Sequence, residues 1–489
     1  MDNKSVSSNK QYQKPFREMT VFELRKQYIA GTLSPVTVIT EALAIIQEKD
    51  EEGHAFLDVY AEEALTLAKV AEIEYKTKRE NTPVLLGIPV ALKNNILVVG
   101  KKATAGSKIL ENYIATYDAT IVTRLKNAGA IIIGATNMDE FAMGSSTENS
   151  AFGPTKNPHD LSRVPGGSSG GSAASVAMGV VPVAIGTDTG GSVRQPASYC
   201  GVVGFKPTYG AVSRYGLVAM GSSLDQAGPL TRSVADAELI HHIMAGPDAY
   251  DATTITPDTY RVVPLKKNYT FGVPRDFLGM GVDAKVLASF EDHIALLKAN
   301  GHTVVDIELP LFEQGLAAYY IVMPAEVSSN LARYDGIRYG LSVAGKNLLD
   351  VYEQSRAIGF GTEVKRRILL GTYVLSSGYY DAYYSQAELV RHKMRVELEA
   401  VFKKVDIILT PTTPTPAFKF GEKSDPLSMY RQDIFTVPVN LTGVPAISLP
   451  MKMVEEDGVA LPVGVQYIGP HGGDDRLFDI GKQIYDTTR

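Results

Sequence analysis

Two glycine- and serine-rich clusters hold the residues whose types and spacing could do chemistry: GGSSGGS at 166–172 and GTDTGGS at 186–192. Glycine lets a backbone approach a ligand closely and adopt positive φ angles. The second cluster directly follows a plausible buried strand at 180–185, and active sites often lie in the loop after a strand. Ser192 could there be a nucleophile beside its own oxyanion hole. The backbone N–H groups that would form this hole belong to Thr189, Gly190 and Gly191.

Other uses of such clusters stay open at this point. A P-loop would need G-x-x-x-x-G-K-S/T and a dinucleotide site would need G-x-G-x-x-G after a strand, and the chain has neither. Residues 166–170 match the G-x-S-x-G elbow of α/β-hydrolases, but no apolar strand precedes them. A flexible loop without chemistry is the plain alternative for either cluster.

A serine nucleophile needs a base. The chain has eight histidines, but neither cluster contains one, and His159, the nearest, lies in a polar turn typical of a surface residue. Lysine is the other candidate, provided that burial lowers its pKa enough to make it neutral. Lys93 ends the apolar run 84–92, which suits that requirement, although most lysines are solvated surface residues.

The elements that must position these residues alternate between helices and strands. Thr20 and Glu23 have the spacing of a capping box, which predicts the start of the first helix. Further helices are expected at 35–49, 61–79, 118–127, 171–178 and 290–300, and strands at 130–134, 180–185, 303–307 and 405–409. The run 84–92, interrupted by Pro89, predicts a strand, a turn and a second strand. This alternation predicts an α/β fold, a mixed or parallel sheet covered by helices on both faces.

The domain organisation expected from these patterns is simple. A flexible polar tail at 1–18 precedes a single domain at 19–489, in which a helical layer at about 19–80 leads into a catalytic core at about 81–489. Residues 1–17 lack the apolar segment of a secretion signal.

Composition limits the class of protein. The 489 residues are 45% hydrophobic and 21% charged, an ordinary globular composition. The net charge of −6 argues against a protein that binds nucleic acid through electrostatic attraction alone. Cys200 is the single cysteine, which excludes an internal disulfide, and no apolar run is long enough for a membrane helix. These features fit a cytoplasmic enzyme, with an organellar location as the alternative.

Three motifs carry a family resemblance: GIPVALKNN with Lys93, PGGSSGGSAASVA with Ser168 and GTDTGGSVRQPAS with Ser192. They resemble the amidase signature family. The resemblance implies that family's fold, a large mixed β-sheet sandwiched between layers of α-helices. It also implies a Ser–cis-Ser–Lys triad without a metal: Ser192 forms the acyl-enzyme, Ser168 is the bridging serine on a cis peptide bond, and Lys93 is the base.

Four further segments, at 137–149, 328–340, 359–384 and 436–450, are similar to the A subunits of glutamyl-tRNA(Gln) amidotransferases, a branch of that family whose substrate is glutamine. The resemblance implies that Arg367 binds the α-carboxylate, Asp433 binds the α-ammonium and Tyr319 lines the site. Arg366 could exchange roles with Arg367. Without the resemblance, both Arg367 and Asp433 would be read as ordinary surface charges.

The implied reaction has two sites. This chain would hydrolyse glutamine without a cofactor and deliver ammonia to a B subunit. That partner would activate Glu-tRNA(Gln) with ATP and Mg²⁺ and then amidate it, while a small C subunit would hold the two together. The negative net charge and the lack of an ATP motif agree with tRNA and ATP being bound mainly by the partner.

One position departs from the family pattern, which usually has Lys-Asp-Asn where this chain has Lys93-Asn94-Asn95. Loss of a carboxylate would make neutral Lys93 easier to reach, if the two groups are close. Three other functions stay open: a stand-alone amidase with the same triad and a different, apolar pocket, a catalytically silent scaffold protein of the complex, and a tRNA-binding module without chemistry, which the net charge disfavours most.

Overall fold

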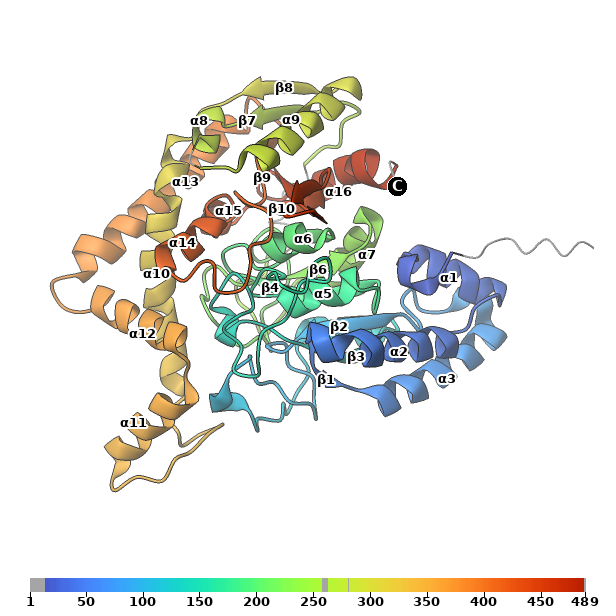
Figure 1. The fold of residues 1–489 in the computed structure, drawn as a ribbon, viewed down its shortest axis with the longest axis horizontal. Coiled ribbons are helices and arrows are strands. Elements are labelled where there is room, and N and C mark those ends of the chain that lie inside the picture. The colour runs from blue at the N-terminus through green and yellow to red at the C-terminus, as the bar shows by residue number, and fades with distance from the viewer. Residues whose placement is uncertain (1–13, 257–262, 280, 488–489) are drawn as a thin grey trace, which may run out of the picture.

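The computed structural model describes residues 14–256, 263–279 and 281–487 (Figure 1). An eleven-stranded mixed sheet lies between layers of helices. Its strand order is β1 (Phe56–Val59), β3 (Ile131–Thr136), β2 (Pro89–Lys93), β4 (Val183–Asp188), β6 (Gln226–Thr231), β5 (Val203–Lys206), β10 (Ala446–Pro450), β13 (Gly464–Ile468), β9 (Ile407–Pro411), β7 (Thr270–Val273) and β8 (Thr303–Asp306). A separate hairpin pairs β11 (Val454–Glu456) with β12 (Val459–Leu461). The expected mixed sheet between helical layers is therefore confirmed.

Most of the α-helices of the described residues pack on this sheet, and α11 and α12 lie away from it. The α-helices are α1 (Val21–Ala30), α2 (Pro35–Gly53), α3 (Ala61–Lys78), α4 (Thr120–Asn127), α5 (Gly170–Ala177), α6 (Arg194–Cys200), α7 (Val234–Met244), α8 (Arg275–Leu278), α9 (Ala284–Ala299), α10 (Gly315–Asn330), α11 (Leu348–Gly359), α12 (Thr362–Val374), α13 (Ser385–Val401), α14 (Pro426–Tyr430), α15 (Val437–Thr442) and α16 (Asp474–Gly481). No described helix is both long and apolar enough to cross a membrane.

The N-terminal helices begin where the sequence predicts. The Thr20 hydroxyl accepts the Glu23 N–H at 3.2 Å, and the Glu23 carboxylate accepts the Thr20 N–H at 2.7 Å, so the capping box is confirmed. Residues 1–13 of the expected tail lie outside the described residues. Phe16–Glu18 form a short 3₁₀ helix, η1, in which Phe16 is buried.

One strand prediction is wrong. The run 84–92 contains a single strand, β2, and the segment before it is a turn. The turn arises because Gly87 has a φ of 75° and packs against Pro35, a conformation and a contact that an extended strand would not permit. The outermost strand, β8, is also mostly exposed rather than buried.

The sheet topology explains how distant residues meet. β2 and β4 are parallel neighbours, with Val90 opposite Val183 and Leu92 opposite Ile185. Their carboxyl ends therefore lie at the same edge, where Lys93 ends β2 and the loop 189–192 follows β4. Figure 1 shows α5, β4 and α6 together near the centre of the molecule, with α11 and α12 on an outer arm attached through α10.

Candidate active site

Lys93 and the first serine cluster are in direct contact. Lys93 Nζ lies 2.7 Å from Ser168 Oγ, 2.9 Å from Ser169 Oγ and 3.3 Å from the carbonyl oxygen of Thr187. Lys93, Ser168 and Ser169 are fully buried, and the Gly167–Ser168 peptide bond is cis, as the family resemblance implies. The geometry provides a short proton path between an amine and a hydroxyl with water excluded.

The amine of Lys93 has the protonation behaviour that a general base needs. Burial lowers its pKa to about 7, while the carboxylates of Asp139, Asp188 and Asp225 act in the opposite direction. A lysine with a pKa near the working pH can exchange a proton in both directions. Its surroundings therefore suit the expected role, in which the buried amine of Lys93 becomes neutral and accepts a proton.

Ser192 lies beside the cluster, in the loop between β4 and α6. The residue is 7% exposed, and its carbonyl accepts the Ser169 N–H at 3.2 Å. The loop is organised by Asp188, whose carboxylate accepts the N–H groups of Gly191 at 2.8 Å and Val193 at 3.1 Å. The same carboxylate accepts hydrogen bonds from Arg194 Nε at 3.0 Å and Arg194 Nη2 at 2.9 Å, so the two opposite charges of this fully buried pair neutralise each other. Although burial opposes it, Arg194 holds the pKa of Asp188 well below its usual range.

The expected oxyanion hole needs a correction at one residue. The Gly191 N–H already donates to Asp188, so it is not free to bind a developing oxyanion in this structure. Within the part of the chain that the structure describes, the N–H groups of Thr189 and Gly190 have no such acceptor. Thr189 and Gly190 remain the candidates, and Gly191 contributes the positive φ of 133° that turns the loop.

The residues expected to bind substrate lie on elements packed around this loop. Tyr319 of α10 is buried, and a Cβ on Gly190 would lie only 2.7 Å from its hydroxyl oxygen. Asp433 is buried and accepts the hydroxyl of Ser145. Thr436 links Asp433 to the loop, because its Oγ1 lies 3.1 Å from the Asp433 carbonyl and 2.6 Å from the Gly190 carbonyl. Burial raises the pKa of the Asp433 carboxyl to about 7, against the nearby Ser145 hydroxyl and the charge of Arg367.

The two arginines of α12 have different environments. The Arg367 side chain is 4% exposed, donates to Glu363 at 2.8 Å, and lies 5.6 and 5.7 Å from the ring centroids of Tyr320 and Tyr430. The Arg366 side chain is 41% exposed and pairs with the same Glu363. Arg367 is therefore the arginine that faces the buried region containing Tyr319 and Asp433.

Similarity to known proteins shows the family of the chain. A sequence model of the family described as Amidase matches residues 37–478. The chain belongs to the amidase family. It is 49% identical to the A subunit of glutamyl-tRNA(Gln) amidotransferase from Streptomyces coelicolor, over 96% of this chain and 95% of the relative, and 50% identical to that from Geobacillus thermodenitrificans, over 96% and 97%.

Solved structures give the same result for this amidase. The crystal structure of the A subunit of glutamyl-tRNA(Gln) amidotransferase from Thermotoga maritima matches with a TM-score of 0.78 and 44% identity, covering 96% of this chain and 95% of that one. A crystal structure described as an amidase matches with a TM-score of 0.81 and 31% identity, covering 96% and 100%.

Sequence reasoning missed two residues of this amidase that shape the site. Ser169 Oγ lies 2.9 Å from Lys93 Nζ, against 2.7 Å for Ser168 Oγ, and the only signal for Ser169 was the doubled serine in GGSSGG. Asp188 was visible in GTDTGGS, but a carboxylate that binds its own loop could not be distinguished there from one that faces a substrate.

The Asn94 side chain makes its hydrogen bonds to residues other than Lys93. Asn94 Oδ1 accepts the Thr104 N–H at 2.8 Å, and Asn94 Nδ2 donates to the Lys102 carbonyl at 3.2 Å. Its side chain therefore secures the turn at 102–104 and has no hydrogen bond to Lys93.

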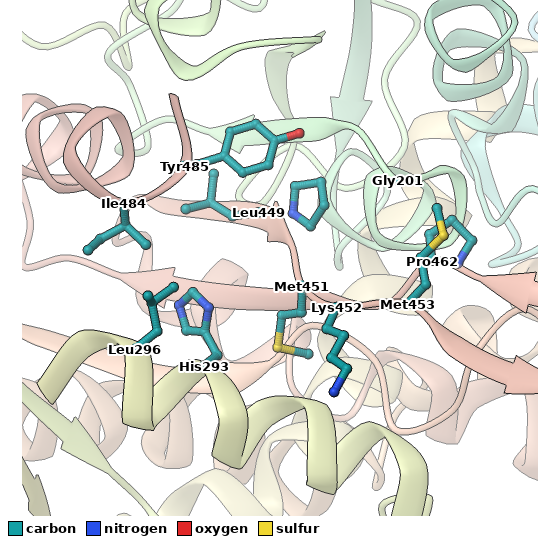
Figure 2. A pocket seen from close by; sticks show the side chains of 11 residues that line it. Gly201, His293, Leu296, Leu449, Met451, Lys452, Met453, Pro462, Ile484 and Tyr485 are labelled. Carbon is teal, nitrogen blue, oxygen red and sulfur yellow. The ribbon is translucent and has the colours of Figure 1, made fainter. Parts of the chain in front are cut away.

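A separate hollow lies away from these residues. Figure 2 shows it, with a volume of about 300 Å³, between His293 and Leu296 of α9, the segment 449–453, and Ile484 and Tyr485 near the described C-terminal end. No residue of the predicted site lines it. Among the described residues, no group of three or more His, Cys, Asp and Glu side chains is placed to hold a metal ion.

Proposed function

We propose that this amidase is the glutamine-hydrolysing A subunit of a glutamyl-tRNA(Gln) amidotransferase, a carbon–nitrogen ligase that uses glutamine as amido donor. The observation that carries the proposal is a buried arginine and a buried aspartate, Arg367 and Asp433, of which Asp433 is linked through Thr436 to the loop that carries Ser192. Free glutamine has an α-carboxylate and an α-ammonium, and burying either one requires an opposite charge. The relatives named above narrow this chemistry to the A subunit of the amidotransferase.

Each residue has a role in the proposed reaction. Ser192 attacks the side-chain amide of glutamine while Ser168 takes its proton and neutral Lys93 takes the proton of Ser168. The N–H groups of Thr189 and Gly190 stabilise the oxyanion, and Lys93 returns a proton through Ser168 to the departing ammonia. Water then attacks the glutamyl-enzyme and gives its proton through Ser168 to Lys93. The proton returns by the same path to Ser192, which leaves as the free hydroxyl. Arg367 and Asp433 hold the substrate's charged ends, and Tyr319 closes the wall beside Gly190.

The proposal includes partner proteins. This chain works in a complex, and we place the use of ATP and Mg²⁺, together with most of the Glu-tRNA(Gln) binding, on a B subunit. A small C subunit joins the two. The proposed location is the cytoplasm, and the proposed domain is a single one at 19–489, with a helical layer at 19–80 on a core at 81–489.

The test is ammonia release from glutamine, measured for the chain alone and with B and C subunits, ATP, Mg²⁺ and Glu-tRNA(Gln). Release that increases with the partners, together with Gln-tRNA(Gln) formation, is the expected result. Ser192→Ala is the control and should release none. A stand-alone amidase takes the place of this proposal if glutamine is untouched under both conditions and a simple aliphatic or aryl amide is cleaved by the chain alone.

A further inference from the structure

Glu140 is a buried acid in the segment 137–149 that the proposed reaction does not use. It is 3% exposed and lies directly after the loop that leaves β3. One carboxylate oxygen accepts the Ser107 hydroxyl at 2.5 Å, and the other accepts the Gly361 N–H at 2.8 Å. Ser107 Oγ also lies 3.2 Å from the Gly359 carbonyl, so Glu140 and Ser107 together hold both ends of the turn between α11 and α12.

The start of α12 depends on this remote contact. Its N-cap residue is Gly361, which has no side chain with which to cap the helix. In a capping box, a glutamate of the helix's own first turn accepts the N–H of the N-cap residue. The acid in the first turn of α12, Glu363, instead binds Arg366, Arg367 and Tyr430. Glu140, distant in sequence, supplies the missing acceptor for the Gly361 N–H.

Packing beside this contact leaves little room for adjustment. A Cβ on Gly359 would lie 2.9 Å from Ile109 Cβ, in the turn that follows Ser107. Phe141, the neighbour of Glu140, packs against Phe360 with ring centroids 5.7 Å apart. The turn 359–361 is thus fixed to the catalytic core by these two packing contacts and by the hydrogen bonds of Glu140 and Ser107.

We propose that Glu140 is a positioning residue for the substrate carboxylate, because it fixes the start of α12 and thereby the place of Arg367. This inference rests on the proposed function, in which Arg367 binds glutamine. Arg367 lies in the second turn of α12, six residues after the anchored Gly361, so a shift of the helix start moves its guanidinium.

Glu140→Leu and Glu140→Gln separate this role from general stability. Leucine fills most of the space but leaves the Gly361 N–H without an acceptor. Glutamine keeps an acceptor for Gly361, because the Ser107 hydroxyl can turn to accept the new amide N–H. In the complex with its partner proteins, Glu140→Leu should raise the KM for glutamine about tenfold and change kcat by about twofold or less. Glu140→Gln should restore KM to within about twofold of the wild-type value.

A matched control is available at Asp236. This buried acid accepts the Val21 N–H at 3.1 Å at the start of α1, and so anchors a helix that carries no site residue. Asp236→Leu should lower the melting temperature without changing the KM for glutamine. If Glu140→Leu does not fold, Ser107→Ala removes the link to Gly359 and should raise KM about threefold.

The outcomes separate the two proposals. No ammonia from glutamine with the wild-type complex means that the proposed function fails, and the role of Glu140 toward glutamine fails with it. Wild-type activity with an unchanged KM in folded Glu140→Leu, or in folded Ser107→Ala where the first does not fold, overturns the Glu140 inference alone. An equal rise in KM for Asp236→Leu overturns it too, because the effect would then be one of general destabilisation.

Discussion

The pH dependence of glutamine hydrolysis should differ between kcat/KM and kcat. Lys93 must be neutral to act as a base, and burial places its pKa at about 7. Asp433 must be ionised to bind the ammonium of glutamine, and burial raises its pKa to about 7 as well. In the free enzyme, both groups therefore have to lose a proton over the same range of pH, and activity falls as the pH is lowered through 7.

The size of the difference follows from these two pKa values. One pH unit below its pKa, about one group in eleven is deprotonated. Because kcat/KM reports the free enzyme, it depends on both groups and should fall by about 100-fold from pH 8 to pH 6. Once glutamine is bound, its ammonium stabilises the ionised form of Asp433, so kcat depends on Lys93 alone. It should fall by about tenfold over the same range.

Steady-state ammonia release by the complete complex, measured from pH 6 to pH 8, gives both profiles. Asp433→Asn is the informative variant, because it should raise KM and reduce the fall in kcat/KM to about tenfold. The reasoning is refuted if kcat/KM and kcat fall equally in the wild-type complex, or if Asp433→Asn leaves the steepness of kcat/KM unchanged.

Three further substitutions test separate parts of the structure. Arg367→Met should raise the KM for glutamine by roughly 10- to 150-fold through loss of charged hydrogen bonds, whereas Arg366→Met should change KM by less than about twofold; steady-state kinetics compares them. Asp188→Asn leaves buried Arg194 without its counter-charge, so it should lower the free energy of unfolding by about 3–5 kcal/mol and also reduce kcat. Denaturant unfolding and steady-state kinetics measure the two effects, and an unchanged free energy of unfolding would contradict the prediction. Thr20→Ala should lower the free energy of unfolding by about 1 kcal/mol with kcat/KM unchanged, which denaturant unfolding also measures.

Local signals in the sequence predicted much of the fold. The capping box at Thr20 and the apolar strand before 186–192 depend on neighbouring residues, and the structure has both elements. The predicted strand before Pro89 failed because its apolar residues fill a turn that packs on the N-terminal helices, and apolar composition alone does not distinguish the two. Predicted and observed element boundaries also differ, since β4 begins at Val183 whereas the strand was expected from residue 180.

The candidate site could be predicted only as far as motifs extend. Lys93, Ser168 and Ser192 stand in segments whose residue types are tied to one chemistry. The contact between Glu140 and Gly361 joins residues 221 positions apart, so no local pattern contains it. The occupied N–H of Gly191 was equally hidden, because only coordinates show that the Asp188 carboxylate turns back onto its own loop.

Burial is the common cause that makes the proposed site work, and it acts on its two kinds of charge in opposite directions. Exclusion of water lowers the pKa of Lys93 and raises that of Asp433, and both reach about 7. A more open site would leave the lysine protonated, and a more closed one would leave the carboxyl neutral. The carboxylates around Lys93 and the guanidinium beside Asp433 oppose these shifts, which keeps each group able to change its protonation state. Arg367 therefore has a second effect besides binding the substrate carboxylate, since its charge also favours the ionised Asp433 that the substrate ammonium requires.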